Sequence, residues 1–315
     1  MYRILTFDGG GIRGLVTLAL LKRIEAQVPA LIQNADLIAG TSTGGIIALG
    51  LAAGKSVDDL ISLYRDKGGE IFDDSWFDDL RDMGGIAGAD YDQKNLEKIL
   101  KTKAIFGDLQ LKDLAKRVVI PSFNLCDKSG GDKSAWTWSP KFFHNFPGND
   151  SDGEASVVDV ALSTSAAPTY FPSHKNFIDG GVVANNPSMA ALARALDTRT
   201  DGPPPELGEI YLLSLGTGIN LSYIEGQNLD WGLAQWVKPL ISLLMDASMG
   251  IADFQCRRIL KDGYRRVAPV FPANVNIKLD EWKRRQELID FGNAAELVDP
   301  WDKGDIVQWL KTTGW

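Results

Sequence analysis

The chain has 315 residues, and its hydrophobic fraction of 44% is enough to fill the core of a large α/β domain. Its 33 basic and 41 acidic residues give a formal net charge of −8. Such a charge repels nucleic acid and gives no broad attraction to anionic bilayers. We therefore expect no nucleic-acid partner, and any contact with lipid has to depend on apolar surface.

The sequence predicts neither a membrane span nor an export signal. No stretch approaches the roughly 18 consecutive apolar residues of a spanning helix, since the richest window, residues 233–245, contains Gln235 and Lys238. The first residues lack the apolar region and cleavage site of a signal peptide. Cys126 and Cys256 have no paired spacing and are expected to be buried thiols. These features predict a cytoplasmic location.

The apolar pattern predicts two strand-turn-helix units at the start of the chain. Residues 3–7 form an apolar run that stops at a glycine-rich turn, and apolar residues then recur at helical spacing over 15–28. A second strand at 35–39 leads through a turn over 40–45 into a helix over 46–53. Two such units favour a sheet that is sandwiched by helices.

Further elements are expected along the rest of the chain. The patterns predict a strand at 117–123, a helix at 156–165, a short strand before Asp179, a helix after Pro187 and an apolar strand at 210–215. The three prolines at 203–205 indicate a surface linker. Residues 66–95 are acidic and glycine-rich and predict a long irregular loop, with a flap over the site as the less favoured alternative.

A candidate nucleophile lies in the second strand-turn-helix unit. Gly40-Thr41-Ser42-Thr43-Gly44 has the G-x-S-x-G form directly between the predicted strand and helix. A sharp strand-to-helix turn tolerates only small neighbours and projects the serine hydroxyl away from the backbone. The motif alone arises easily by chance in a glycine-rich protein, but this context favours Ser42 as a nucleophile.

The order of the chain disfavours a histidine as the base for Ser42. His144 and His174 both lie between Ser42 and Asp179, so the order Ser, Asp, His is impossible with Asp179 as the acid. His144, next to three phenylalanines, is expected to be packed or on the surface, and His174 stays a minor candidate. Two histidines also leave few ligands for a catalytic zinc.

Asp179 is the remaining candidate base because of its setting. It ends an apolar strand and is followed by Gly180 and Gly181, so another backbone segment can approach it closely. Desolvation raises the pKa of a carboxylate and makes it a stronger base. The alternative reading is an aspartate that merely opens a turn.

The first glycine-rich turn, Asp8-Gly9-Gly10-Gly11-Ile12-Arg13-Gly14, can supply donors to a developing oxyanion. Consecutive glycines at a helix start expose backbone N–H groups at the positive end of the helix dipole. Gly10 and Gly11 are the candidates, and Arg13 adds a positive charge that could hold the loop or meet a phosphate headgroup. A dinucleotide-binding loop has the same spacing but expects an acid after the second strand, where this chain has the Ser42 turn.

Together these segments resemble the patatin-like phospholipase family. The family pattern is D-G-G-G-x-R-G, here Asp8–Gly14, then G-T-S-x-G, here Gly40–Gly44, then D-G-[GA], here Asp179–Gly181. Further similarities are the segments at 165–172, 185–187 and 213–218, so that the resemblance spans roughly residues 3–250.

The resemblance implies a three-layer α/β/α sandwich, with a mostly parallel central sheet, and a lipid acyl hydrolase with a Ser-Asp dyad. By position, Ser42 attacks the acyl carbonyl, Asp179 takes its proton and later activates water, and Gly10, Gly11 and Arg13 stabilise the oxyanion. The family needs neither metal nor cofactor, so no calcium dependence is expected. The partner is a membrane or micellar lipid, reached by peripheral contact.

Residues 1–315 are expected to form one domain, with 251–315 as an extension that packs on the core. The tryptophans of this extension are expected to cap the core rather than anchor at a lipid interface. The apolar stripe over 233–245 is expected to face the core, with lining of an acyl groove as the alternative. Alternatives for function are a carboxylesterase or acyltransferase on the same dyad, and a phospholipase effector that a signal activates.

Overall fold

A seven-stranded sheet runs through the centre of the molecule in the computed structural model, which describes residues 1–71, 92–200, 202–226, 230–301 and 303–315. The strands follow the order β4-β3-β2-β1-β6-β7, and β5 pairs with β3. Their bounds are β1 (Tyr2–Phe7), β2 (Leu37–Gly40), β3 (Arg117–Asp127), β4 (Thr137–His144), β5 (Phe177–Asp179), β6 (Ile210–Leu215) and β7 (Tyr264–Val267).

The pairing is parallel from β3 through β2, β1 and β6 to β7, whereas β4 and β5 run antiparallel to β3. Parallel neighbours need a crossover connection, which here is helical in each case. Strand β3 is longer than the predicted run at 117–123. Only its first residues pair with β2, and the part that extends further pairs with β5.

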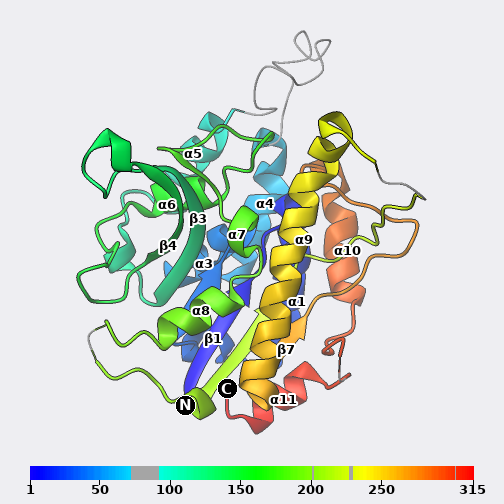
Figure 1. Cartoon of the computed structure of the whole chain (residues 1–315). Helices are drawn as coiled ribbons and strands as arrows, with labels where there is room; N and C mark the ends of the chain where they lie inside the picture. Colours follow the sequence, from blue (N-terminus) through cyan, green and yellow to red (C-terminus); the bar gives the residue numbers. More distant parts are fainter. Residues whose placement is uncertain (72–91, 201, 227–229, 302) are drawn as a thin grey trace.

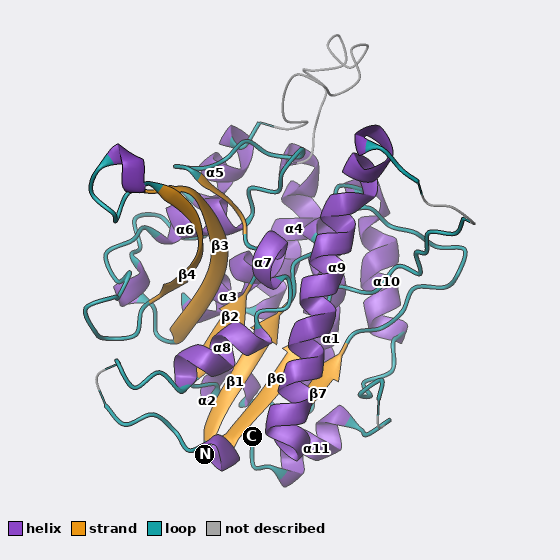
Figure 2. Ribbon diagram, in the orientation of Figure 1, coloured by secondary structure: helices purple, strands orange, loops and turns teal. Residues whose placement is uncertain are grey.

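Helices cover both faces of the sheet, as expected for a three-layer α/β/α sandwich. In Figures 1 and 2, α8 and α9 lie in front of the sheet, and α1, α3 and α10 lie behind it. The helices are α1 (Gly14–Glu25), α2 (Leu31–Asn34), α3 (Thr43–Ala52), α4 (Val57–Ile71), α5 (Lys94–Leu100), α6 (Val157–Thr164), α7 (Gly181–Ala184), α8 (Ser188–Ala195), α9 (Leu233–Leu260), α10 (Arg285–Ala294) and α11 (Ile306–Thr312). No helix among the described residues is long and apolar enough to cross a membrane.

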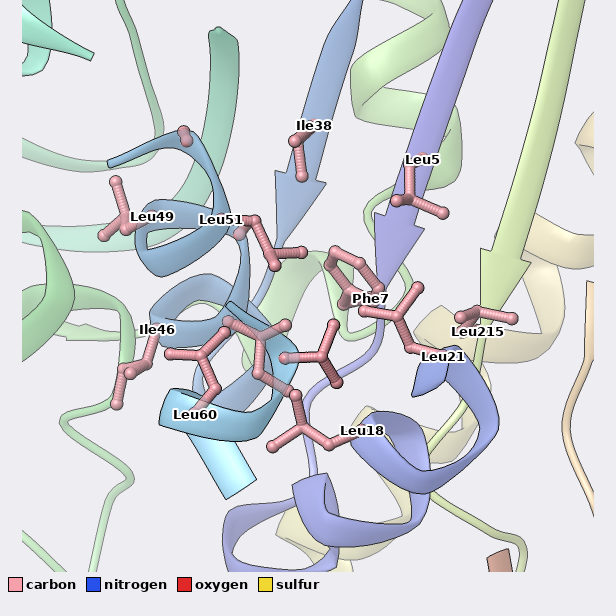
Figure 3. Packing of buried hydrophobic residues seen from close by; sticks show 14 of the residues in the cluster. Leu5, Phe7, Leu18, Leu21, Ile38, Ile46, Leu49, Leu51, Leu60 and Leu215 are labelled. Carbon is pink, nitrogen blue, oxygen red and sulfur yellow. The ribbon is translucent and has the colours of Figure 1, made fainter. Parts of the chain in front are cut away.

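Two apolar clusters fill the spaces between these layers. Successive residues of a strand point to opposite faces, so Leu5 packs in the cluster behind the sheet and Ile4 in the cluster in front of it. Figure 3 shows the rear cluster, where Phe7 of β1 lies near Leu18 and Leu21 of α1. Because both faces are covered, the central strands are mostly buried on both sides, and β2 is buried along its whole length.

Two predictions about local structure were wrong. Helix α4 runs to Ile71 and α5 begins at Lys94, so both ends of the predicted loop at 66–95 are helical, while residues 72–91 lie outside the described part. The stripe over 233–245 does not face the core as a whole, since Leu240 and Leu244 are exposed and Met245 is buried. Periodicity identified the helix but not the face that packs, because α9 lies on the outside of the sandwich.

The segment after residue 250 joins the sheet through α9 and β7. Trp309 and Trp315 are buried in the rear cluster, in agreement with a capping role, whereas Trp301 is 70% exposed. The buried Arg266 of β7 donates to both carboxylate oxygens of Asp8, at the end of β1, and to the Ser214 hydroxyl of β6 at 2.6 Å. This ion pair ties three strands together below the glycine-rich turn.

We expect Arg266→Met to lower the free energy of unfolding by about 3–5 kcal/mol, because it leaves the buried Asp8 carboxylate without its partner. Urea denaturation measures the loss. The control is Arg258→Met on the exposed side of α9, which should cost less than about 1 kcal/mol. An Arg266→Met loss as small as that of the control would contradict this assignment.

Candidate active site

The candidate residues gather at one edge of the sheet. The glycine-rich turn follows β1, Ser42 follows β2 and Thr217 follows β6, and these three strands are parallel neighbours. Their carboxyl ends therefore lie side by side. In open α/β sheets, ligands bind outside these ends, at the point where the connections of two adjacent strands run to opposite sides. Here the chain leaves β1 towards β2 on one side and β6 towards β7 on the other.

Ser42 lies in a strained turn between β2 and α3. Its backbone has φ 54° and ψ −122°, a conformation that non-glycine residues rarely adopt. The turn is so tight that a Cβ on Gly40 would overlap the carbonyl oxygen of Gly44. A Cβ on Gly44 would in turn overlap the Phe7 carbonyl oxygen, so close backbone approach explains both glycines of the motif. The serine side chain lies at the start of α3 and is largely buried.

Thr164, at the end of α6, holds the turn in place. Its hydroxyl accepts a hydrogen bond from the Ser42 N–H at 3.0 Å and donates to the Pro121 carbonyl of β3 at 2.5 Å. Its own carbonyl accepts from the Gly180 N–H at 3.2 Å. Thr164 thus links the Ser42 turn to β3 and to Gly180, the residue after Asp179.

Asp179 is brought to Ser42 by the antiparallel pairing of β5 with the extended part of β3, where it lies opposite Ser122. The carboxylate is 2% exposed, and its Oδ1 accepts from the Gly181 N–H at 2.6 Å. Its Oδ2 is buried without a hydrogen bond in the described part of the structure. That oxygen remains available to accept a proton.

Burial raises the pKa of Asp179 to about 6, against smaller opposing effects from the Ser42 hydroxyl and the Gly181 N–H. No well-aligned hydrogen bond of 3.5 Å or less joins the two side chains, although Ser42 is near enough to lower this pKa. Such contacts are commonly long in unliganded enzymes and shorten when substrate binds. A carboxylate with this pKa is a stronger base than an exposed one but is still mostly ionised at neutral pH.

The glycine-rich turn presents free backbone donors beside the serine. In the described structure, the N–H groups of Gly10 and Gly11 form no hydrogen bond, whereas those of Gly9 and Ile12 donate to the Asn185 and Leu279 carbonyls. Gly11 has φ 57°, and a Cβ there would overlap the Leu279 carbonyl oxygen. Any other residue would therefore be strained at position 11.

Two members of the same motif take different positions. Gly14 begins α1, and a Cβ on it would overlap the Thr43 hydroxyl. Arg13 is half-buried, but its side chain lines a neighbouring cavity and not the one that contains Ser42. Its Nε lies 3.5 Å from the Gly10 carbonyl oxygen. Gly11 thus lines the cavity that contains Ser42, Gly10 precedes it in the same turn, and Arg13 lines the neighbouring cavity.

An apolar cavity of about 50 Å³ adjoins Ser42 and Asp179. This volume holds a few water molecules but is far smaller than a typical ligand pocket of roughly 300 Å³ or more. Helices α3, α4 and α9 and the segment after α6 form its walls, with side chains of Ile46, Leu63, Tyr64, Ile71, Phe171 and Met245. The surroundings of the serine are therefore suited to a hydrocarbon group.

Neither histidine belongs to this cavity. His144 is buried on β4 beside Phe146, and His174 lies 2.8 Å from the Asp159 carboxylate at the start of α6. Within the described ranges, no group of three His, Cys, Asp or Glu side chains could hold a metal ion.

Sequence reasoning missed two residues of the site, Thr164 and Tyr64. Tyr64 exchanges hydrogen bonds with the hydroxyl and carbonyl of Thr43, next to the serine. Thr164 directly precedes the segment at 165–172 that was noticed, but nothing in the sequence distinguishes its hydroxyl. Both contacts cross more than twenty residues of chain, so only the fold reveals them.

Comparison with known proteins gives a consistent result. Residues 5–192, more than half of the chain, match the family model described as patatin-like phospholipase. A cGAMP-activated phospholipase of Vibrio cholerae is 39% identical over 68% of this chain and 64% of its own length. Patatin-like protein 2 of Arabidopsis thaliana is 29% identical over 82% of this chain and 72% of its own. The solved structure of VipD from Legionella pneumophila has a TM-score of 0.39 and 13% identity, over 92% of this chain and 67% of that one.

The raised pKa of Asp179 predicts a cost in stability. Between pH 4 and pH 6 the folded state binds this proton more tightly than the unfolded state, so its contribution to stability falls as the pH rises through that range. We expect Asp179→Asn to raise the free energy of unfolding at pH 8 by on the order of 2 kcal/mol and to have little effect at pH 4. Urea denaturation at both pH values measures this, with the exposed Asp132→Asn as the control. Equal effects at the two pH values would contradict the prediction.

Proposed function

The chain belongs to the patatin-like phospholipase family, and on that premise we propose that it is a lipid acyl hydrolase. It cleaves fatty acyl ester bonds of glycerolipids through Ser42 and Asp179 and forms a covalent acyl-enzyme. The observation that carries this proposal is the buried, incompletely hydrogen-bonded carboxylate of Asp179 beside a serine in a strained turn.

In this mechanism Asp179 removes the proton of the Ser42 hydroxyl as the oxygen attacks the acyl carbonyl. Desolvation makes the carboxylate basic enough for this task, and its buried Oδ2 is the acceptor. The same carboxyl group returns the proton to the leaving alcohol. It then activates the water that hydrolyses the acyl-enzyme.

The tetrahedral intermediate carries a negative charge that needs fixed donors. Among the described residues the N–H groups of Gly10 and Gly11 are free, Gly11 lines the cavity at Ser42, and the start of α3 adds the positive end of a helix dipole. We assign the oxyanion hole to the two glycines. Arg13 lines the neighbouring cavity, so we leave it out of this assignment.

The surface next to the site supports peripheral contact with lipid. Leu240, Leu243 and Leu244 of α9 are between 41% and 46% exposed, and the next residue, Met245, lines the cavity at Ser42. An apolar surface of this kind can enter a lipid interface without help from charge, as the net charge of −8 requires.

One observation favours the alternative of an effector that a signal activates. The cavity of about 50 Å³ cannot hold a fatty acyl chain, so the site has to open before a lipid can react. Relatives named cGAMP-activated phospholipase make a small-molecule trigger a reasonable candidate. A lipid interface is the simpler trigger, and measuring activity on micelles with and without cyclic dinucleotide separates the two.

We expect Ser42→Ala and Asp179→Asn each to lower fatty acid release from mixed phospholipid micelles at least a thousandfold, on the order seen when a nucleophile or its base is removed. EDTA should leave the wild-type rate unchanged. Circular dichroism and the urea midpoint establish that each variant is folded. A folded Ser42→Ala protein with full activity would disprove the mechanism, and short soluble esters tested alongside identify a general carboxylesterase.

The pH profile tests the role of Asp179 separately. A base with a pKa of about 6 predicts that kcat/KM falls tenfold for each pH unit below that value and is level above it. A soluble ester is the right substrate, because its own ionisation and aggregation do not change over this range. A profile without a bend between pH 5 and pH 7 would exclude Asp179 as the base.

A further inference from the structure

A second cavity of about 320 Å³ lies next to the one at Ser42. Tyr170, Met245 and Leu279 line both cavities, so the two share a wall. Unlike the first, the second cavity is lined by charged and polar groups as well as apolar ones. These include Arg13, Asn185, Asn220, Ser242, Asp246 and Lys278.

The second cavity begins close to the nucleophile. A Cβ placed on Gly9 would lie 3.4 Å from the Ser42 Cβ and would overlap the Asn185 side-chain oxygen. Ser42 and Asn185 therefore both pack against Gly9. Asn185 is 3% exposed, lines the second cavity and has its Oδ1 buried without a hydrogen bond. Asn185 therefore connects the surroundings of Ser42 with the lining of this cavity.

Two opposite charges face this cavity without neutralising each other. Arg13 is half-buried, and Asp246, the residue after Met245 on α9, is exposed at the rim. Among the described residues, neither side chain forms an ion pair within 4 Å. Burial lowers the pKa of Arg13 and raises that of Asp246, and the attraction between the two groups opposes both shifts. An inner cation and an outer anion thus remain available to a ligand.

We propose that this cavity binds the headgroup of a zwitterionic phospholipid, with the phosphate at Arg13 and the ammonium group at Asp246. The inference rests on the proposed function, because it names the substrate class of the same site. The planar guanidinium presents paired N–H donors that match phosphate oxygens. In such a lipid the phosphate is nearer the glycerol esters and the ammonium group lies beyond it, in the same order as Arg13 and Asp246.

Other glycerolipids fit this pair of charges less well. A galactolipid leaves both charges without a partner, and an anionic phospholipid such as phosphatidylglycerol places no cation at Asp246. Asp246 also lies outside residues 5–192, the part that matches the family model. The proposed headgroup preference therefore does not follow from the match to the family model.

The first test compares hydrolysis of phosphatidylethanolamine, phosphatidylglycerol and monogalactosyl diacylglycerol of equal chain length, in neutral detergent micelles, with a short soluble ester as reference. We expect the wild type to prefer phosphatidylethanolamine. Asp246→Asn should lower the ratio of kcat/KM on this lipid to that on the reference by about three- to tenfold, because an exposed charge pair contributes modestly. The change should be in KM, since Asp246 contacts a part of the lipid that does not react.

Two further variants make this result specific. Asp246→Lys should reverse the preference towards phosphatidylglycerol, a gain that a damaged fold cannot produce. Asp132→Asn removes the same charge from a distant exposed turn and should leave the ratio as in the wild type. If Asp246→Asn keeps the wild-type ratio, or Asp246→Lys shows no shift, the headgroup inference is overturned while the hydrolase proposal stands.

The second test needs no catalysis. Binding of glycerophosphoethanolamine to Ser42→Ala is measured by titration calorimetry or NMR, with inorganic phosphate and glycerophosphoglycerol as comparison probes. We expect glycerophosphoethanolamine to bind more tightly than either, and a second substitution, Asp246→Asn, to remove that advantage. If phosphate binds equally well, the cavity is a simple anion site and the inference is wrong. If Ser42→Ala binds selectively but the wild type hydrolyses no ester, the headgroup site is upheld and the proposed function is rejected.

Discussion

The parallel pairing of β1 with β2 and β6 is the constraint on which the site depends. Because the three strands run in the same direction, the turns that follow them meet at one edge of the sheet. One turn carries the free N–H groups of Gly10 and Gly11, the next carries Ser42 and the third carries Thr217. The buried ion pair between Asp8 and Arg266 holds the base of the first turn to the neighbouring strands. The donors and the nucleophile are therefore placed by the sheet rather than by mobile side chains.

The base reaches this edge by a different route. Strand β3 continues past the end of β2, and the antiparallel β5 pairs with the part that projects. Thr164 joins this arrangement to the Ser42 turn through three hydrogen bonds of 3.2 Å or less. The surrounding segments bury Asp179, and this burial raises its pKa and costs folding free energy. At this position a lower folding stability accompanies a stronger base.

Helix α9 relates the two cavities to the surface of the molecule. Consecutive residues of an α-helix point about 100° apart; Met245 lines both cavities, whereas Asp246 lines only the polar one. Leu240, Leu243 and Leu244, on the exposed side of the same helix, present apolar surface to the surroundings. One helix therefore borders the acyl group, the headgroup and the lipid interface of the proposed substrate complex. In Figure 1 it runs along the front of the sheet beside β7.

The sequence by itself determined the layered α/β class and the first two strand-turn-helix units, because these depend on local patterns of apolar residues and glycine. It also proposed Ser42, Asp179, Gly10, Gly11 and Arg13 as site residues. Because the turn at Gly40–Gly44 tolerates only small residues, its motif can be recognised from the sequence without the structure. Only the tertiary structure decided which side of α9 packs, that Arg13 lines a cavity next to the one at Ser42, and that Thr164, Asn185 and Asp246 lie near the site. These contacts join segments that are far apart in the chain. Their geometry is set by packing between layers, which the spacing of residues along a sequence does not encode.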